Sequence, residues 1–205
     1  MSLTVFEREE RNTYYISSEE KGAVGLLADY IYSMILKQPN EYDRIVVVCI
    51  GTDRSTGDSL GPLVGKFLRK RRKIKKICKV WGSLDYPVHA KNLYWYLDRI
   101  QEEKPLVIAI DACLGKMENI GKIFIHEGSI KPGSGVEKEL PEIGDISICG
   151  IVNNSGLLNS LILQNTRLSH VYKMAEIISE AINKALTKFI NTGSTRRVSP
   201  VFKAD

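Results

Sequence analysis

The stretch IVVVCIGTDRSTGDSLGPLVGKF, residues 45–67, is the most informative part of this 205-residue sequence. Its first six residues are apolar and mostly β-branched, which predicts a strand at 45–50 that is covered on both faces. A glycine-rich loop follows, and from Leu60 onward the apolar residues recur at helical spacing. Pro62 is compatible with the first turn of that helix, where its missing N–H has no partner to lose. In open α/β sheets, ligands bind at such strand–loop–helix connections.

The rest of the chain continues this alternation of strands and helices. Strands are predicted at 45–50, 77–81, 106–110, 123–125 and 146–151, and helices at 18–37, from 60 to about 68, at 93–100 and at 168–190. A capping box at 17–20, SSEE, is expected to start the first helix. With right-handed crossovers, this order predicts a three-layer α/β/α sandwich around a mostly parallel sheet. We expect a single domain at 17–191, an N-terminal arm at 1–16 and a disordered tail at 192–205.

The composition favours a soluble globular protein of the cytoplasm. Hydrophobic residues make up 43% of the chain and charged residues 26%, which suits one domain with a sizeable core. No stretch approaches the roughly 20 apolar residues of a membrane span, and residues 1–11 are charged, unlike a signal peptide. Because Cys49, Cys78, Cys113 and Cys149 are widely spaced, we interpret them as free thiols.

A basic run at 69–76, RKRRKIKK, accounts for the net charge of +5, because the rest of the chain is slightly acidic. The run is either a solvated helix end or a contact surface for nucleic acid or an acidic partner. Nucleic acid is not expected as a partner, because no aromatic residues are interleaved to stack on bases. Whether the chain forms a homo-oligomer stays open.

Two aspartates follow strands that the topology would bring together. Asp58 follows the strand at 45–50, and Asp111 ends the strand at 106–110. If the strands at 45–50, 77–81 and 106–110 take the order 2-1-3, both aspartates reach one crevice at the topological switch point. Two carboxyl groups in one partly desolvated cleft can act as acid and base on a water, which is hydrolytic chemistry. Taken singly, each could instead cap a helix or satisfy backbone N–H groups.

Several other residues are candidates for a role at this site. The substrate-binding candidates are Thr52, Asp53, Ser59, Ser83, Gly133 and Ser134. Asp53 also fits a surface turn with Arg54 and Ser55. No cofactor is expected; if a divalent metal is bound, its candidate ligands are Asp58, Asp111 and His126. His89 is interpreted as a cap or surface residue and His170 as structural. The glycine spacing fits neither a phosphate loop nor a dinucleotide fingerprint.

Three segments of the sequence resemble the germination protease of spore-forming bacteria in order and spacing. They are GT at 51–52 with TGDSLGP at 56–62, VIAIDA at 107–112, and IKPGSGV at 130–136. As a whole, the chain is most similar to the YyaC-type sporulation proteins, a small group often described as spore proteases. The resemblance covers residues 43–190.

The resemblance implies a hydrogenase-maturation-protease-like fold, a member of the phosphorylase/hydrolase-like class. It also implies that Asp58 and Asp111 are a catalytic pair. In the nickel-sensing maturation proteases, the same two positions bind metal together with a histidine. The comparable segment here, PEIGD at 141–145, has no histidine, although Asp145, Glu142 or His126 could substitute.

The sequence therefore predicts a cytoplasmic peptidase of the sporulating cell or forespore that acts on a protein or peptide. Asp58 and Asp111 would activate water at the peptide bond. Two alternatives stay open. One is a metal-dependent processing protease. The other is a non-catalytic sporulation protein that binds a partner, for instance through the basic run at 69–76.

Overall fold

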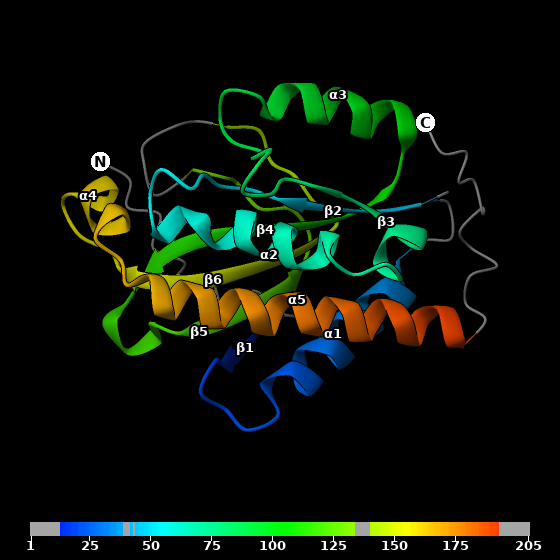
Figure 1. Ribbon diagram of the computed structural model, residues 1–205, viewed down its shortest axis with the longest axis horizontal. Helices are drawn as coiled ribbons and strands as arrows, with labels where there is room; N and C mark the ends of the chain where they lie inside the picture. The colour runs from blue at the N-terminus through cyan, green and yellow to red at the C-terminus, as the bar shows by residue number, and fades with distance from the viewer. Residues whose placement is uncertain (1–12, 39–41, 43, 134–139, 193–205) are drawn as a thin grey trace.

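The computed structural model describes residues 13–38, 42, 44–133 and 140–192. These residues form one six-stranded sheet with helices on its faces (Figure 1). In chain order the elements are β1 (Thr13–Ser17), α1 (Ala23–Lys37), β2 (Ile45–Cys49), η1 (Gly57–Ser59), α2 (Leu60–Arg69), η2 (Ile74–Lys76), β3 (Cys78–Trp81), α3 (Leu93–Glu103), β4 (Leu106–Gly115), η3 (Met117–Asn119), β5 (Lys122–Glu127), β6 (Ile146–Asn154), α4 (Asn159–Gln164) and α5 (Leu168–Asn191). The η elements are single turns of 3-10 helix.

The sheet has the order β1-β5-β6-β4-β2-β3, with β2 in the position expected for the topological switch point. β3, β2, β4 and β6 are parallel, whereas β5 is antiparallel to both β6 and β1. All five residues of β2 are buried, as its β-branched sequence predicts for a central strand. The predicted 2-1-3 order of the first three parallel strands is confirmed, and the last residue of β2, Cys49, pairs with Ile110, the residue before Asp111. β4 does not stop at Asp111 as predicted, because it continues to Gly115 in pairing with β6.

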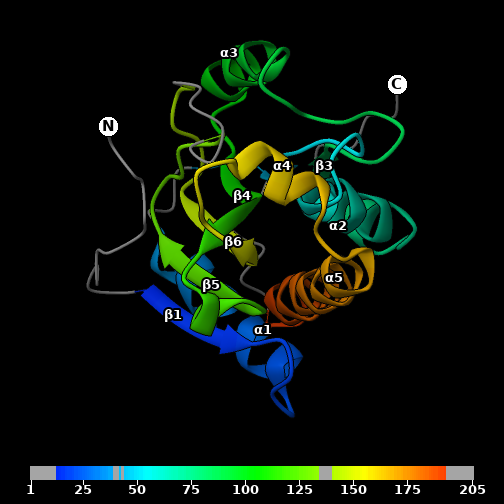
Figure 2. The same cartoon turned by 90° about the vertical axis from the view of Figure 1, so that its left-hand side faces the viewer.

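The two faces of the sheet are covered differently, as Figure 2 shows. α1, α2 and α5 pack on one face, where the core contains Ile31, Val64 and Ile178. On the other face lie α3 and the connection from β5 to β6, which contributes Ile130 and Ile143 to a second core. The predicted three-layer architecture and mostly parallel sheet are confirmed, although a single helix and an irregular segment form the second helical layer.

The first elements differ from the sequence prediction. Residues 13–16, placed in the expected N-terminal arm, form the edge strand β1 with Ser17, against β5. The first helix begins at Ala23, after Gly22 in a left-handed conformation with φ 95°, and not at 18. The predicted capping box does not form, because Ser17 ends β1 and its Oγ accepts from the Glu19 N–H (3.2 Å), five residues before the N-cap Gly22 of α1. The short helix α4 has no predicted counterpart.

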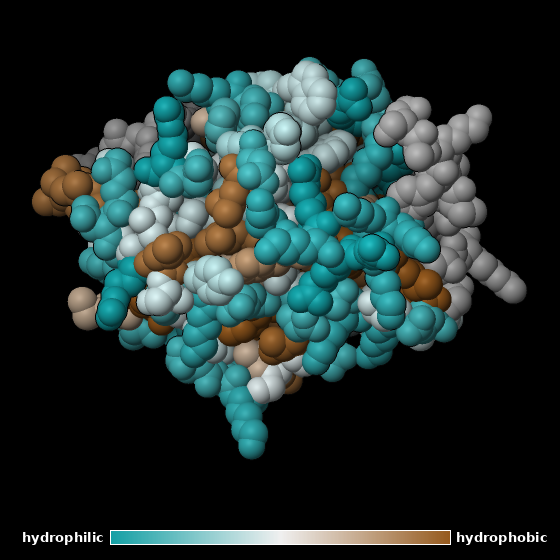
Figure 3. Space-filling view, viewed as in Figure 1, coloured by the Kyte–Doolittle hydropathy of each residue, from teal (hydrophilic) through white to brown (hydrophobic). Residues whose placement is uncertain are grey.

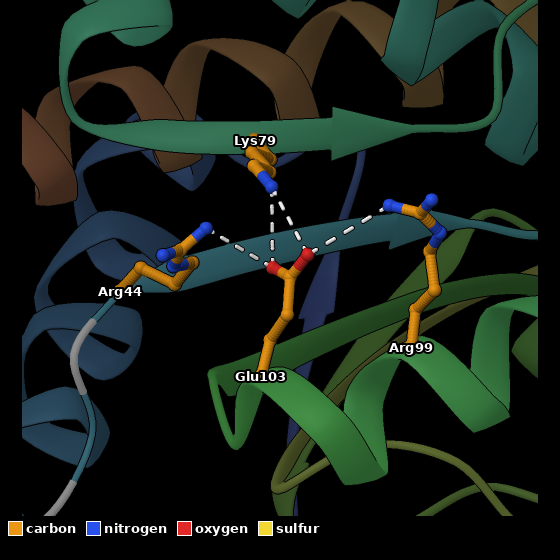
Figure 4. A network of polar contacts seen from close by, with 4 residues as sticks. All are labelled: Arg44, Lys79, Arg99 and Glu103. Carbon is orange, nitrogen blue, oxygen red and sulfur yellow. Dashed lines mark hydrogen bonds and ion pairs between the residues drawn. The ribbon is translucent and has the colours of Figure 1, made fainter. Parts of the chain in front are cut away.

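A network of charged side chains holds the C-terminal end of α3 against the sheet (Figure 4). Glu103 ends α3, and its carboxylate contacts Lys79 of β3 at 3.2 Å and Arg44 before β2 at 3.1 Å. Arg99, one turn earlier on α3, approaches the same carboxylate at 3.9 Å. Because the Glu103 side chain is only 19% exposed, its charge needs these partners. The network ties the only α-helix described on this face to the adjacent strands.

The open edge of the sheet at β3 is occupied by a side chain. Arg69, the last residue of α2, donates from Nη2 (2.9 Å) and Nε (3.3 Å) to the Val80 carbonyl of β3. Arg69 belongs to the basic run at 69–76, so one member of that run has a structural role.

Within the described residues, no helix is both long enough and apolar enough to cross a membrane. The four cysteines are free thiols, as predicted, and Cys49, Cys78 and Cys149 are buried.

Candidate active site

The loop after β2 folds tightly back over the end of its own strand. Gly51 has φ 137°, and a Cβ there would collide with the Asp58 carbonyl oxygen. That same carbonyl accepts a hydrogen bond from the Thr52 N–H (3.1 Å). Only glycine combines this backbone conformation with so close an approach. The loop therefore holds Asp58, in the turn η1, beside the carboxyl end of β2.

Asp111 reaches the same place from β4. It follows the five buried residues Leu106–Ile110 and pairs with Cys149 of β6, so the strand itself fixes its position. Its Oδ1 atom accepts a hydrogen bond from the Ala112 N–H (2.8 Å). The Gly133 N–H lies near this carboxyl group and lowers its pKa. Gly133 comes from the segment between β5 and β6, which runs along this face of the sheet to the aspartate.

The two carboxyl groups line one pocket of about 400 Å³. Its described wall consists of Ile50, Gly51, Thr52, Asp53, Arg54, Asp58, Pro87, His89, Ala90, Lys91, Asp111, Pro132, Gly133 and Leu140. One side of the wall is the loop between β3 and α3, which is joined to the end of β2 by a bridge between Ile50 and Val88. The Gly51 N–H also donates to the Val88 carbonyl (2.8 Å). Larger surface hollows lie along α5, away from the aspartates.

The pocket gives the two aspartates different affinities for a proton. Burial raises the pKa of Asp111 to about 8; the charge of Asp58 adds to this rise, and the N–H donors of Ala112 and Gly133 oppose it. Burial also raises the pKa of Asp58, and the nearby Ser55 hydroxyl opposes that rise. Ser55 Oγ is buried and has no well-formed hydrogen bond to any described residue, so it acts on Asp58 as a neighbouring dipole. Asp111 therefore holds its proton at neutral pH.

This proton makes stability depend on pH. As the pH rises from about 4 to about 8, we expect the melting temperature of the wild-type protein to decrease more than that of an Asp111→Asn variant. An unfolded Asp has a pKa of about 3.9, whereas Asp111 in the folded protein has a pKa of about 8, so the folded state binds the proton more tightly. The resulting stability is complete below pH 4 and is lost by pH 8.

An amide at position 111 does not ionise, so the variant should show a flatter profile. Calorimetry from pH 4 to 9 would measure the difference, and 1 kcal/mol corresponds to about 2–4 °C for a domain of this size. Parallel melting curves for the two proteins would contradict the raised pKa.

The structure places the predicted substrate-binding residues unevenly. Thr52, Asp53 and Gly133 line the aspartate pocket. Ser59 and Ser83 do not, because both are buried in turns: Ser59 Oγ donates to the Thr56 carbonyl (2.6 Å), and Ser83 Oγ accepts from the Tyr86 N–H (3.3 Å). Their hydroxyls stabilise the loops around the pocket. Ser134 lies outside the described residues.

His126 is not at the aspartates, contrary to its prediction as a metal-ligand candidate. His126 of β5 pairs with Ser147 of β6, and Ser147 pairs with Ala109 of β4. His126 is therefore two strands away from β4, at the level of Ala109, which is two residues before Asp111. The reason is that β5 runs antiparallel, and its last residues point away from the carboxyl ends of the parallel strands. The His126 ring instead contacts the Ser129 carbonyl (3.2 Å).

The sequence interpretation missed the side of the pocket formed by the loop before α3. His89 and Lys91 line the pocket together with Arg54, which had been assigned to a surface turn. His89 Nδ1 is buried and has no hydrogen-bond partner among the described residues. The 2-1-3 strand order contained the signal, because it places the loop after β3 beside the loop after β2.

Comparison with known proteins agrees with the resemblance seen in the sequence. Residues 15–181 match the family model described as "Protein of unknown function (DUF1256)". The chain belongs to this family. A DUF1256 relative, "Uncharacterized protein YyaC" from Bacillus subtilis (strain 168), is 44% identical over 181 residues, which cover 87% of this chain and 86% of YyaC. The similarity to YyaC-type proteins predicted from the motifs is thus confirmed.

Among solved structures, this DUF1256 chain is similar to the [NiFe] hydrogenase maturation protease HycI from Thermococcus kodakarensis KOD1. The match has a TM-score of 0.44 and 22% identity, and it covers 70% of this chain and 94% of HycI.

The DUF1256 chain offers no ready-made metal centre in its described part. No group of three or more His, Cys, Asp or Glu side chains is arranged there to hold an ion. Asp145, named as a substitute ligand, binds the Val107 N–H through Oδ2 (2.8 Å). Glu142 accepts a hydrogen bond from Ser129 Oγ (2.6 Å). Both carboxylates therefore have structural partners outside the aspartate pocket.

Proposed function

We propose that this DUF1256 protein is a peptidase in which Asp58 and Asp111 are the acid–base pair. The observation that supports this most directly is the presence of Asp58 and Asp111 in one pocket, where burial raises the pKa of both and that of Asp111 to about 8. Such a pair suits hydrolysis, because one group can accept a proton while the other donates one. The proposed setting, spore formation or germination in the cytoplasm, is supported by the motif resemblance alone.

The ionised Asp58 carboxylate would take a proton from a water as the water oxygen attacks the peptide carbonyl carbon. The protonated Asp111 would donate its proton to the leaving nitrogen as the C–N bond breaks. The products are a carboxylic acid and an amine, with Asp58 protonated and Asp111 ionised. Transfer of one proton between the aspartates restores the starting state. The Gly133 and Ala112 N–H groups stabilise the ionised Asp111 during this step.

The lining of the pocket offers polar groups on both sides of the aspartates. The aspartates lie between two loops, one after β2 and one before α3, and residues from both line the pocket. Thr52 and Asp53 on one side and His89 and Lys91 on the other present polar side chains to a bound main chain. These are the residues that would position a peptide bond over the aspartates.

The test is a search for new peptide termini by mass spectrometry after incubation of the purified protein with a mixed peptide library. We expect cleavage whose rate falls above about pH 8, where Asp111 ionises, and falls at acid pH, where Asp58 becomes protonated. The rate should be unchanged by EDTA. A rate abolished by EDTA and restored by nickel or zinc would establish the metal-dependent alternative. Absence of new termini from pH 4 to 9 would refute the peptidase proposal.

A further inference from the structure

A concentrated basic surface lies where the connection between α2 and β3 meets the second half of α5. Figure 3 shows hydrophilic side chains gathered over this region. The exposed cations that define the basic surface are Lys70, Arg72, Lys73, Lys75, Lys76 and Lys184. The first five come from the run at 69–76, and Lys184 comes from α5, more than 100 residues later. The fold therefore adds to the charge that the sequence run already carries.

A hollow of about 460 Å³ lies within this surface. Lys73 lines one side, and residues of α5 and its end line the other: Asn183, Lys184, Thr187, Lys188, Asn191 and Thr192. Among the described residues of this lining there is no carboxylate and no aromatic ring. The hollow thus offers ammonium, amide and hydroxyl groups to a ligand.

Nearby acidic residues do not neutralise the basic surface. Glu180 of α5 is paired with Arg71 at 2.6 Å, and Asp29 of α1 is paired with Lys188 at 2.8 Å. The six cations of the basic surface have no ion pair with any described residue. Glu176 and Glu180 line a separate hollow next to this one, with Lys70 and Arg71. A dense, uncompensated positive charge on one surface attracts polyanions.

The residue types indicate which polyanion fits. Lysine, asparagine and threonine are common donors to the phosphates of nucleic acids, to which lysine binds as a point charge. A carboxylate-rich protein partner would favour the two-pronged guanidinium group, but only Arg72 among the six cations supplies one. No described aromatic ring lines the hollow, and the nearby Tyr32 ring is already covered by Lys188 Nζ at 4.6 Å, so base stacking, the basis of single-strand binding, is not favoured. This does not affect contacts to the backbone of a duplex.

We propose that the basic surface binds the phosphate backbone of double-stranded nucleic acid, without base specificity. This goes beyond the sequence interpretation, which set nucleic acid aside because the run lacks aromatic residues. The run is only part of the surface, since Lys184 and the amide and hydroxyl groups of α5 join it in the folded protein. The surface lies near the end of α5, whereas the aspartate pocket lies at the carboxyl end of β2, beside Asp111 in the middle of β4. A bound duplex would leave that pocket open.

The test is fluorescence anisotropy of a labelled duplex of mixed sequence, titrated with the full-length protein at several salt concentrations. For duplex DNA, the logarithm of the binding constant falls linearly with the logarithm of salt concentration, by about 0.9 per phosphate contacted. We expect a slope between about −2 and −5, consistent with two to six contacts. A Lys73→Glu/Lys184→Glu variant should bind at least about 10-fold more weakly, with a slope shallower by about 2.

The matched control is Lys21→Glu/Arg167→Glu, which makes the same change in net charge at exposed positions outside the basic surface. It should bind within about twofold of the wild type. If both variants lost the same affinity for the duplex, the effect would come from net charge alone, and the proposed binding site would be overturned. No binding at 50 mM salt would also overturn it. Preference for a single strand, or equally strong competition by a polyglutamate peptide, would point to another partner and overturn the duplex proposal. None of these readouts depends on peptidase activity.

Discussion

Asp58→Asn protein is expected to cleave peptides at least about 1,000-fold more slowly than the wild type while melting at a similar temperature. The amide keeps the size of the carboxyl group but cannot accept a proton from water, and general acid–base catalysis contributes typically 10²–10⁴-fold to rate. Stability should be little changed, because burial already raises the pKa of Asp58 and its ionised form gains little from the fold. Initial rates by mass spectrometry and a calorimetric scan would measure both effects.

Asp53→Asn is the matched control for this variant. Asp53 lines the same pocket from the same loop but is exposed and is not part of the proposed pair. Replacing the Asp53 carboxylate by an amide should alter the rate of peptide cleavage by no more than about 10-fold. Asp111→Asn should lose activity like Asp58→Asn, and both losses should appear in the maximal rate. Full activity of Asp58→Asn would rule out the aspartate-pair mechanism.

Gly61→Ala is expected to lower the free energy of unfolding by about 3 kcal/mol or more. Gly61 is buried in the first turn of α2, and a Cβ there would collide with the carbonyl oxygen of Ile50 at the end of β2. The neighbouring atoms are backbone, so they cannot move aside as a flexible side chain would. The helix must therefore withdraw from the strand. Urea denaturation would measure the loss, and the site should be disturbed with it, because Asp58 precedes this turn.

Gly25→Ala provides the opposite control. Gly25 lies inside α1, and a Cβ there would meet nothing within 4 Å. Because alanine loses less conformational entropy than glycine in a helix, this change should stabilise the protein by about 0.5–1 kcal/mol. A Gly61→Ala protein as stable as the wild type would contradict the close approach of α2 to the Ile50 carbonyl at the end of β2.

The arrangement of the aspartates was predictable because it depends on strand order. The buried β-branched run at 45–50 identifies a central parallel strand, and the 2-1-3 order then places Asp58 near Asp111. Strand direction at the edge was not predictable in the same way. The apolar residues 123–125 fit either direction, and the antiparallel one removes His126 from the carboxyl edge.

Other failures arose where long-range contacts override local signals. The SSEE segment at 17–20 has the pattern of a capping box, but Ser17 pairs with Lys122 as the end of an edge strand, a partner that is distant in sequence. The hydroxyls of Ser59 and Ser83 looked available for substrate because each is in a loop, yet both complete turns that local sequence does not reveal. His89 was interpreted as a cap, whereas its backbone N–H is the group that is capped, by Asn92 Oδ1 at 2.8 Å.

The contact between Arg69 and β3 bears on how copies of this protein can meet. An exposed edge strand offers unpaired backbone groups to a second chain, and this is a common route to aggregation. Here the guanidinium group of Arg69 already occupies the Val80 carbonyl, and β3 has only four residues. A second sheet could pair along this edge only by displacing that side chain. Arg69 thus opposes sheet-to-sheet pairing at the β3 edge, and β1 forms the other edge of the sheet.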